Sequence, residues 1–164
     1  MTPYALVTFF HPVIHADLEG EAQYGHFLDW LNGLLPSPNI FYAIRVEGDF
    51  SRVRARSVPR QANYRPLADV VTEQSSFHFE NIRGTLAGFY TPSFMSSLSV
   101  PGHHLHFIAE DVASGGHLTA CTPRKVSAAI QPIHRLELNM PLTRDYLKLD
   151  FQRDLGKDID KIEK

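Results

Sequence analysis

The alternation of hydrophobic and polar residues predicts a chain built mainly of β-strands, with one main helix. Between Glu21 and Leu35 the apolar residues recur with a helical period, which predicts an amphipathic helix that ends at Pro36. Strands are predicted where β-branched and aromatic residues alternate with polar ones or form short runs. These runs are Tyr4–Phe10, Ile40–Val46, Phe50–Val58, Ser76–Phe79, Arg83–Tyr90, His103–Ala109, His117–Cys121, Lys125–Ile130 and His134–Asn139.

The connections between these runs predict one hairpin and two short helices. Glu47–Asp49 has a glycine at its centre and lies between two strand-like runs, so we expect a turn there that folds Phe50–Val58 back on Ile40–Val46. Short helices are expected at Leu67–Glu73 and Thr143–Leu149. Many strands with one long helix predict an α/β (α+β) fold, a mixed and largely antiparallel β-sheet or half-barrel.

Composition narrows the possible functions. A chain of 164 residues with 43% hydrophobic residues fits a single domain, residues 1–164, with its own core. The 16 basic and 18 acidic residues give a formal net charge of −2, so neither nucleic acid nor a membrane is expected as a partner. The N-terminus lacks the basic region of a signal peptide, and the single Cys121 excludes an internal disulfide. We therefore expect a cytoplasmic protein.

A cluster of histidines in the sequence GHHLHFIAEDVASGGH is the candidate chemical site. Side chains alternate along a strand, so His104 and His106 point to the same face, about 7 Å apart along the strand. Gly115 and Gly116 permit a chain reversal that would bring His117 opposite His106. Three imidazoles at one point predict a metal site with open coordination positions, as catalytic metals have.

Alternatives to this interpretation remain open at the level of the residues. Imidazole suits zinc, iron, copper and nickel, so the ligands alone leave the metal undecided. A cupin also carries H-x-H followed by a glutamate, here Glu110, but His117 follows too soon for its last histidine. An isolated histidine is more often structural or solvent-facing than a ligand, and this is expected of His11, His15, His26, His78 and His134.

Four segments in order resemble the alpha-acetolactate decarboxylase family over nearly the whole chain. They are LLPSPNIFYAIRVEGDF, FHFENIRGTLAGFYTPSF, GHHLHFIAEDVASGGH and KDIDKIE. The most specific signal is R-G-T-x-x-G-F-x-T-P followed by G-x-H-L-H-F and then G-G-H. The resemblance implies that the three clustered histidines, His104, His106 and His117, hold Zn2+. It also implies a functional arginine at Arg56, with Arg52 and Arg54 as close rivals, and a C-terminal Glu163 that reaches the metal.

The resemblance implies an activity as well. A small 2-hydroxy-3-keto acid, acetolactate, would lose carbon dioxide and give acetoin, with zinc as the Lewis acid that stabilises the enediolate. Arg56 would hold the substrate carboxylate, and Glu163 or a water molecule on the metal would supply the proton.

The chain departs from the family at its N-terminus. Family members carry an additional region there, which supplies another glutamate to the site. Three explanations are open: a shortened relative, a missing piece that is a separate chain, or a site that works differently. The rival functions are a related zinc enzyme with tautomerase, cyclase or lyase chemistry on another keto acid, and a non-catalytic metal-binding relative. An open sheet edge predicts association, expected as a homodimer.

Overall fold

The computed structural model describes residues 5–58 and 74–148. The chain divides into two compact units, one formed by residues 1–57 and 76–134 and the other by residues 58–75 and 135–164. The first unit holds the sheet. Its elements are β1 (Ile14–Glu19), α1 (Tyr24–Leu34), β2 (Phe41–Ser57), β3 (Ser75–Thr91), the short 3-10 helix η2 (Ser93–Met95), β4 (Gly102–Ala109) and β5 (Gly115–Ile133).

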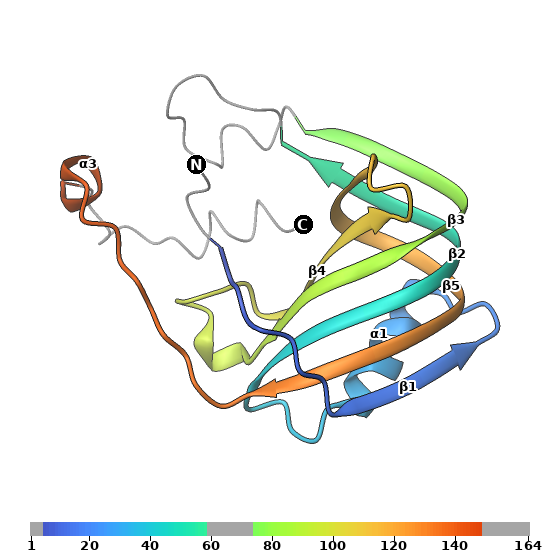
Figure 1. The fold of residues 1–164 in the computed structure, drawn as a ribbon, viewed down its shortest axis with the longest axis horizontal. Helices are drawn as coiled ribbons and strands as arrows, with labels where there is room; N and C mark the ends of the chain where they lie inside the picture. Colours follow the sequence, from blue (N-terminus) through green and yellow to red (C-terminus); the bar gives the residue numbers. More distant parts are fainter. Residues whose placement is uncertain (1–4, 59–73, 149–164) are drawn as a thin grey trace. The chain divides into compact units, whose positions relative to one another are not determined.

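Four of the strands close into a ring of antiparallel pairs. The strand order is β1-β5-β2-β3-β4, and an additional pairing of β4 with β5 joins the two ends of the series β5-β2-β3-β4 (Figure 1). β5 is 19 residues long, so one of its edges pairs with β2 while the other pairs first with β4 and then with β1. The sheet is thus a small barrel with β1 added outside the ring, which agrees with the predicted α+β class and its largely antiparallel sheet.

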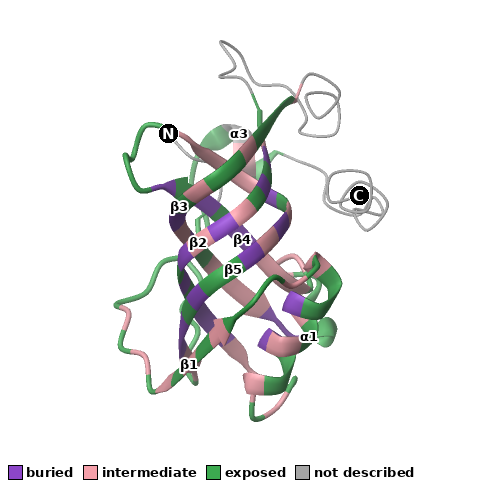
Figure 2. Ribbon diagram, turned by 90° about the vertical axis from the view of Figure 1, so that its right-hand side faces the viewer, coloured by how far each residue is buried: buried purple, intermediate pink, exposed green. Residues whose placement is uncertain are grey.

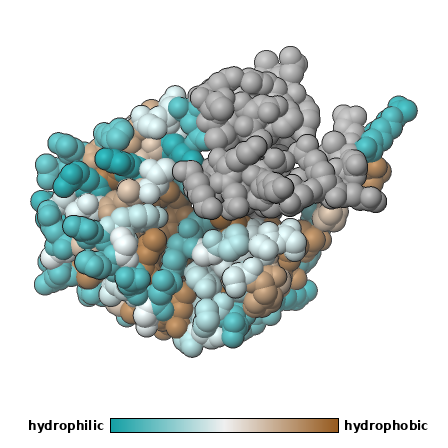
Figure 3. Space-filling model, turned by 180° about the vertical axis from the view of Figure 1, so that it is seen from behind, coloured by the Kyte–Doolittle hydropathy of each residue, from teal (hydrophilic) through white to brown (hydrophobic). Residues whose placement is uncertain are grey.

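The core lies on one face of these strands and against α1. Buried and exposed residues alternate along the strands (Figure 2), as expected when one face packs and the other meets solvent. Phe27 and Leu31 of α1 are fully buried and belong to the same apolar cluster as Phe50, Leu105 and Phe107. Burying each such side chain contributes about 1.5–3 kcal/mol, so this cluster holds the ring together. On the face shown in Figure 3, hydrophilic side chains of the described residues surround only small hydrophobic areas.

Several predicted elements are confirmed. The amphipathic helix forms as α1, three residues later than predicted, and the strand at His103–Ala109 forms as β4. In the second unit a single turn of helix, α3 (Arg144–Leu147), lies within the predicted Thr143–Leu149. No helix in the described residues is long and apolar enough to cross a membrane. The predicted helix at Leu67–Glu73 lies outside the described residues.

The predicted hairpin at Glu47–Asp49 is wrong, because β2 runs straight through it. Gly48 has a φ of +148°, and a Cβ there would overlap the carbonyl oxygen of Lys125 on β5. The pairing register with β5 shifts between Asp49 and Phe50, which marks a bulge. The glycine therefore serves a close approach of two strands and a local bend, and no chain reversal follows.

Two other pairs of predicted strands are single strands. Ser76–Phe79 and Arg83–Tyr90 both belong to β3, although Asn81 between them has a φ of 48°. His117–Cys121 and Lys125–Ile130 both belong to β5, which continues through Pro123 opposite Phe50 of β2. Local polar or proline residues interrupt the sequence pattern, but the neighbouring strand keeps the backbone extended.

Two predicted strands do not form. Residues 5–13 have no regular secondary structure, so the prediction at Tyr4–Phe10 is wrong, and the first strand is Ile14–Glu19, paired with β5. Residues 134–143 have none either, which corrects His134–Asn139. Leu136 and Leu138 are 45% and 58% exposed. A strand pattern needs a neighbouring strand for its hydrogen bonds, and in the described residues neither segment has one.

Candidate metal centre

Two of the three clustered histidines come from β4. Leu105 and Phe107 are each 2% exposed and point into the core. By alternation His104 and His106 therefore point to the opposite face of the sheet, as the sequence predicts. The apolar side chains between the histidines fix which face the imidazoles occupy, because slipping the register by one residue would bury the histidines and expose Leu105.

The third histidine is brought back by the turn between β4 and β5. The N–H of Ala109 donates to the carbonyl oxygen of Ser114 at 2.8 Å, and the Asp111 carboxylate accepts the N–H of Ala113 at 2.9 Å. The returning strand pairs His117 directly opposite His106, so the predicted reversal is confirmed. Gly116 is required there, because at φ +159° its Cβ would come within 2.6 Å of the carbonyl oxygen of Arg56.

The three rings converge closely enough to share an ion. One ring nitrogen from each of His104, His106 and His117 lies within 4.8 Å of the others. The Nε2 atoms of His104 and His106 are 3.2 Å apart. Tetrahedral zinc with Zn–N bonds of about 2.0–2.1 Å places two of its ligand atoms roughly 3.3–3.4 Å apart, so this spacing suits a common metal. No other group of metal-ligating side chains occurs in the described part of the chain.

The surroundings favour the neutral form of two of the three imidazoles. Burial lowers the pKa of His104, and the positive charge of Arg56 lowers it further. The pKa of His117 falls to about 3, chiefly through burial and then through His104, Arg56 and His106. Only a neutral imidazole has a lone pair for a metal, so His104 and His117 are ready to act as ligands at neutral pH.

Arg56 is the arginine next to the histidines. It pairs in register with His117, whereas Arg54 and Arg52 pair with Ala120 and Thr122 further along β5. Buried Val53 and Ala55 separate these three arginines, so all three lie on one face, as the alternation predicts. A guanidinium beside a site for a cation is unfavourable unless an anion lies between them. This arrangement therefore favours an anionic ligand.

The other candidate residues named from the sequence are not part of the histidine cluster in the described residues. Glu163 lies outside the described residues. Cys121 is 3% exposed and burial raises its pKa to about 12, so the thiol stays protonated and packs as a small apolar group. The histidines expected to be structural or solvent-facing are all exposed: His11, His15, His26, His78 and His134.

A support behind the site was not evident from the sequence. His103, on the opposite face of β4, shares a hydrogen bond of 2.8 Å with the side-chain oxygen of Asn32 on α1. Its ring lies edge-on to Tyr90 of β3, with 5.1 Å between the centroids. Burial lowers the pKa of His103 to about 4. Only the tertiary packing of α1 against β4 reveals this contact, because Asn32 is 71 residues away.

The fold and the site together define a class: a small antiparallel β-barrel with three histidines placed to hold one metal ion. The family model described as alpha-acetolactate decarboxylase matches residues 1–153. The chain is 43% identical to the alpha-acetolactate decarboxylase of Methanosarcina mazei over 164 residues, and 40% identical to that of Brevibacillus brevis over 150 residues. This chain belongs to the alpha-acetolactate decarboxylase family.

A solved structure has the same fold. The crystal structure of alpha-acetolactate decarboxylase from Bacillus subtilis strain 168 superposes with a TM-score of 0.90 at 35% identity, and the match covers 95% of this chain and 68% of that one. The match to the Methanosarcina mazei relative covers 99% of this chain but 57% of that protein. The match to the Brevibacillus brevis relative covers 91% of this chain and 53% of that protein. It thus corresponds to rather more than half of those proteins.

Proposed function

We propose that this chain carries the metal centre of an acetolactate decarboxylase, which converts acetolactate to acetoin and carbon dioxide. The observation that carries the proposal is the convergence of three imidazole nitrogens within 4.8 Å, beside an arginine paired with one of them. The relatives' names supply the substrate, and the site supplies a place for a metal and for a carboxylate.

The donor set fits zinc. His104, His106 and His117 would hold the ion, and three imidazoles leave at least one coordination position for a substrate. Three protein ligands with an open position are typical of catalytic zinc, whereas structural zinc sites are closed by four. Zinc bound there would supply Lewis-acid stabilisation of the negative charge that develops when carbon dioxide leaves.

The residues of the chain would do the rest. The guanidinium of Arg56 would bind the substrate carboxylate through charge-assisted hydrogen bonds and so orient the bond that breaks. Because His104 and His117 are neutral, they keep their lone pairs for the metal, and the charges that attract the anionic substrate would be those of Arg56 and the ion. The role of Glu163 as proton donor stays a prediction, since that residue lies outside the described part.

Replacing one metal ligand tests the proposal. We expect His104→Ala to lose stoichiometric zinc and at least about 100-fold of the rate of acetoin formation, because a Lewis acid contributes several kcal/mol to the transition state. The measurements are metal analysis and acetoin formation on the same purified sample. His78→Ala is the matched control, since His78 is an exposed histidine on β3 outside the cluster, and it is expected to keep both properties.

Three outcomes distinguish the proposal from its rivals. A fully active His104→Ala, or acetoin formation that survives a chelator, would refute the metal mechanism. Zinc binding without acetolactate turnover, but with turnover of another keto acid in a small panel, would indicate a related zinc enzyme. One equivalent of zinc with no turnover of any keto acid would indicate a non-catalytic relative.

A further inference from the structure

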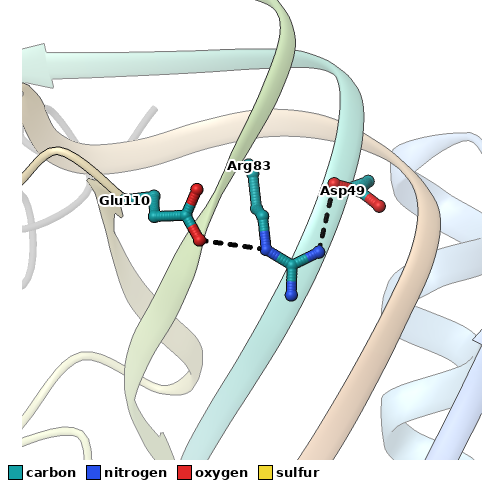
Figure 4. A network of polar contacts seen from close by, with 3 residues as sticks. All are labelled: Asp49, Arg83 and Glu110. Carbon is teal, nitrogen blue, oxygen red and sulfur yellow. Dashed lines mark hydrogen bonds and ion pairs between the residues drawn. The ribbon is translucent and has the colours of Figure 1, made fainter.

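Arg83, the first residue of the R-G-T motif, links three strands of the ring. Its Nε donates to Oε1 of Glu110 at 3.2 Å and its Nη1 to Oδ1 of Asp49 at 3.3 Å (Figure 4). Its carbonyl oxygen also accepts the N–H of Glu110 at 3.1 Å. Arg83 lies on β3, Asp49 on β2, and Glu110 directly after the end of β4. The Arg83 side chain thus contacts residues in, or directly after, the two strands that flank β3 in the sheet.

The contact with Glu110 bears on the metal ligands. Glu110 is the first residue of the turn between β4 and β5, and only three residue pairs join those strands: His106 with His117, Phe107 with Gly116, and Ile108 with Gly115. Two of the three pairs contain a glycine, which adds no side-chain packing. The position of the turn therefore has a large influence on where His117 lies relative to His106.

The contact with Asp49 bears on the arginine of the site. Asp49 directly precedes the first of three register shifts between β2 and β5, and Gly48 before it has a φ of +148°. A bulge bends its strand and redirects the side chains that follow it. Arg56 lies on the segment that follows these shifts, so holding Asp49 restrains the first of the bends that set the direction of Arg56.

The backbone of β3 next to Arg83 is closely packed. At the next residue, Gly84, a Cβ would come within 2.5 Å of the Phe107 ring and of the Ile108 carbonyl oxygen. Gly84 pairs with Ala109 at the end of β4. The β3 backbone therefore lies close against β4 at this point. This holds Arg83 in place, so that its side chain can restrain Glu110 after β4 and Asp49 on β2.

We propose that Arg83 is a positioning residue, which holds the β4–β5 turn and the β2 bulge so that His117 and Arg56 keep their places beside His104 and His106. The inference rests on the proposed metal site for its consequence. The Arg83 side chain is 56% exposed, and exposed ion pairs contribute little to folding stability. The effect of losing it should therefore fall on metal and substrate binding more than on unfolding.

The test compares two arginine variants with the same loss of charge. Arg83→Gln is expected to weaken zinc binding about 3- to 10-fold, somewhat less than the loss usual for groups that contact a ligand directly. Arg45→Gln is the matched control: Arg45 also lies on the barrel, forms a 3.2 Å ion pair with Glu47 and has a similarly exposed side chain, at 48%. Zinc affinity is measured by competition with a chromophoric chelator, and the unfolding midpoint of each metal-free variant is measured beside it.

Removing each partner separates the two contacts. Glu110→Gln is expected to weaken zinc binding, and combining it with Arg83→Gln should cause no further loss. Asp49→Asn is expected to raise KM for acetolactate while zinc affinity stays unchanged, because it frees the segment that carries Arg56. Arg83→Lys keeps the charge without the planar fork and should give an intermediate zinc affinity, which also tests the inference should Arg83→Gln fail to fold.

Each result decides the question. Wild-type protein that binds zinc while Arg83→Gln binds it as tightly as Arg45→Gln would overturn this inference and leave the proposed function intact. Loss of zinc affinity only in proportion to a lower unfolding midpoint would also overturn it. A wild-type chain that binds no zinc would overturn both.

Discussion

At the scale of single residues, the site combines neutral ligands with one fixed positive charge. Burial and neighbouring positive charge lower the pKa values of His104 and His117, so both imidazoles are neutral at neutral pH and add no positive charge beside a bound metal. Arg56 remains charged, and its charge is unfavourable beside a metal unless an anion is bound. The position of Arg56 beside the three histidines therefore favours an anionic ligand, which supports its proposed role in binding a substrate carboxylate.

The choice among the three arginines can be tested directly. Arg56→Gln is expected to raise KM for acetolactate roughly 10- to 100-fold, the equivalent of one charge-assisted hydrogen-bonded pair, with zinc content unchanged. Steady-state kinetics with metal analysis measures this. Arg54→Gln is the control from the same face of β2, where the register places it opposite Ala120. A larger effect in Arg54→Gln would transfer the carboxylate-binding role to that rival.

At the scale of the elements, glycines decide how closely and in which direction the strands run. Gly48 lets β2 pass near Lys125 of β5 at a bulge, and Gly116 lets β5 pass near Arg56 of β2. Both sites lie where the register or the backbone departs from a regular ladder. These departures let neighbouring backbones approach closely, and the bulge in β2 bends the strand ahead of the segment that carries Arg56.

Two glycine variants distinguish this role from simple conformational freedom. Gly48→Ala is expected to lower the free energy of unfolding by about 2 kcal/mol or more, because its Cβ would overlap the Lys125 backbone at a φ rarely adopted by other residues. Gly33→Ala, in α1, meets nothing within 4 Å and is expected to be neutral or to stabilise by up to about 1 kcal/mol. Urea unfolding measures both. Equal effects would show that Gly48 is not held by close packing.

At the scale of the whole molecule, the site exists only because the ring closes. Arg56 and His117 are far apart in sequence and meet through the pairing of β2 with β5, while His106 and His117 meet through β4 and β5. Folding and metal binding should therefore be linked, since a ligand that binds only the folded chain stabilises it. The single domain, the homodimer and the cytoplasmic location stay predictions from the sequence.

This linkage predicts how the metal-free protein responds to acid. The pKa of His117 is about 3 in the folded chain, against an ordinary value of 6.5 when it is exposed by unfolding. Between these values the unfolded chain binds a proton that the folded chain does not, so stability falls as the pH drops from about 6.5 towards 3. Urea unfolding at a series of pH values, with a chelator present, should show this slope. It should be shallower in His117→Gln, and an unchanged slope would contradict the assignment.

The sequence determined the elements whose signal is local. The helical period of α1, the alternation that puts His104 and His106 on one face, and the glycine-rich reversal to His117 are all properties of neighbouring residues, and all three form. The family followed from motifs in a fixed order. Tertiary structure decided what depends on partners distant in sequence: that Glu47–Asp49 continues a strand, that His134–Asn139 does not form one, and that Arg56 lies nearest the histidines. A strand is completed by hydrogen bonds to another strand, so its limits are set by a neighbour that local pattern does not specify.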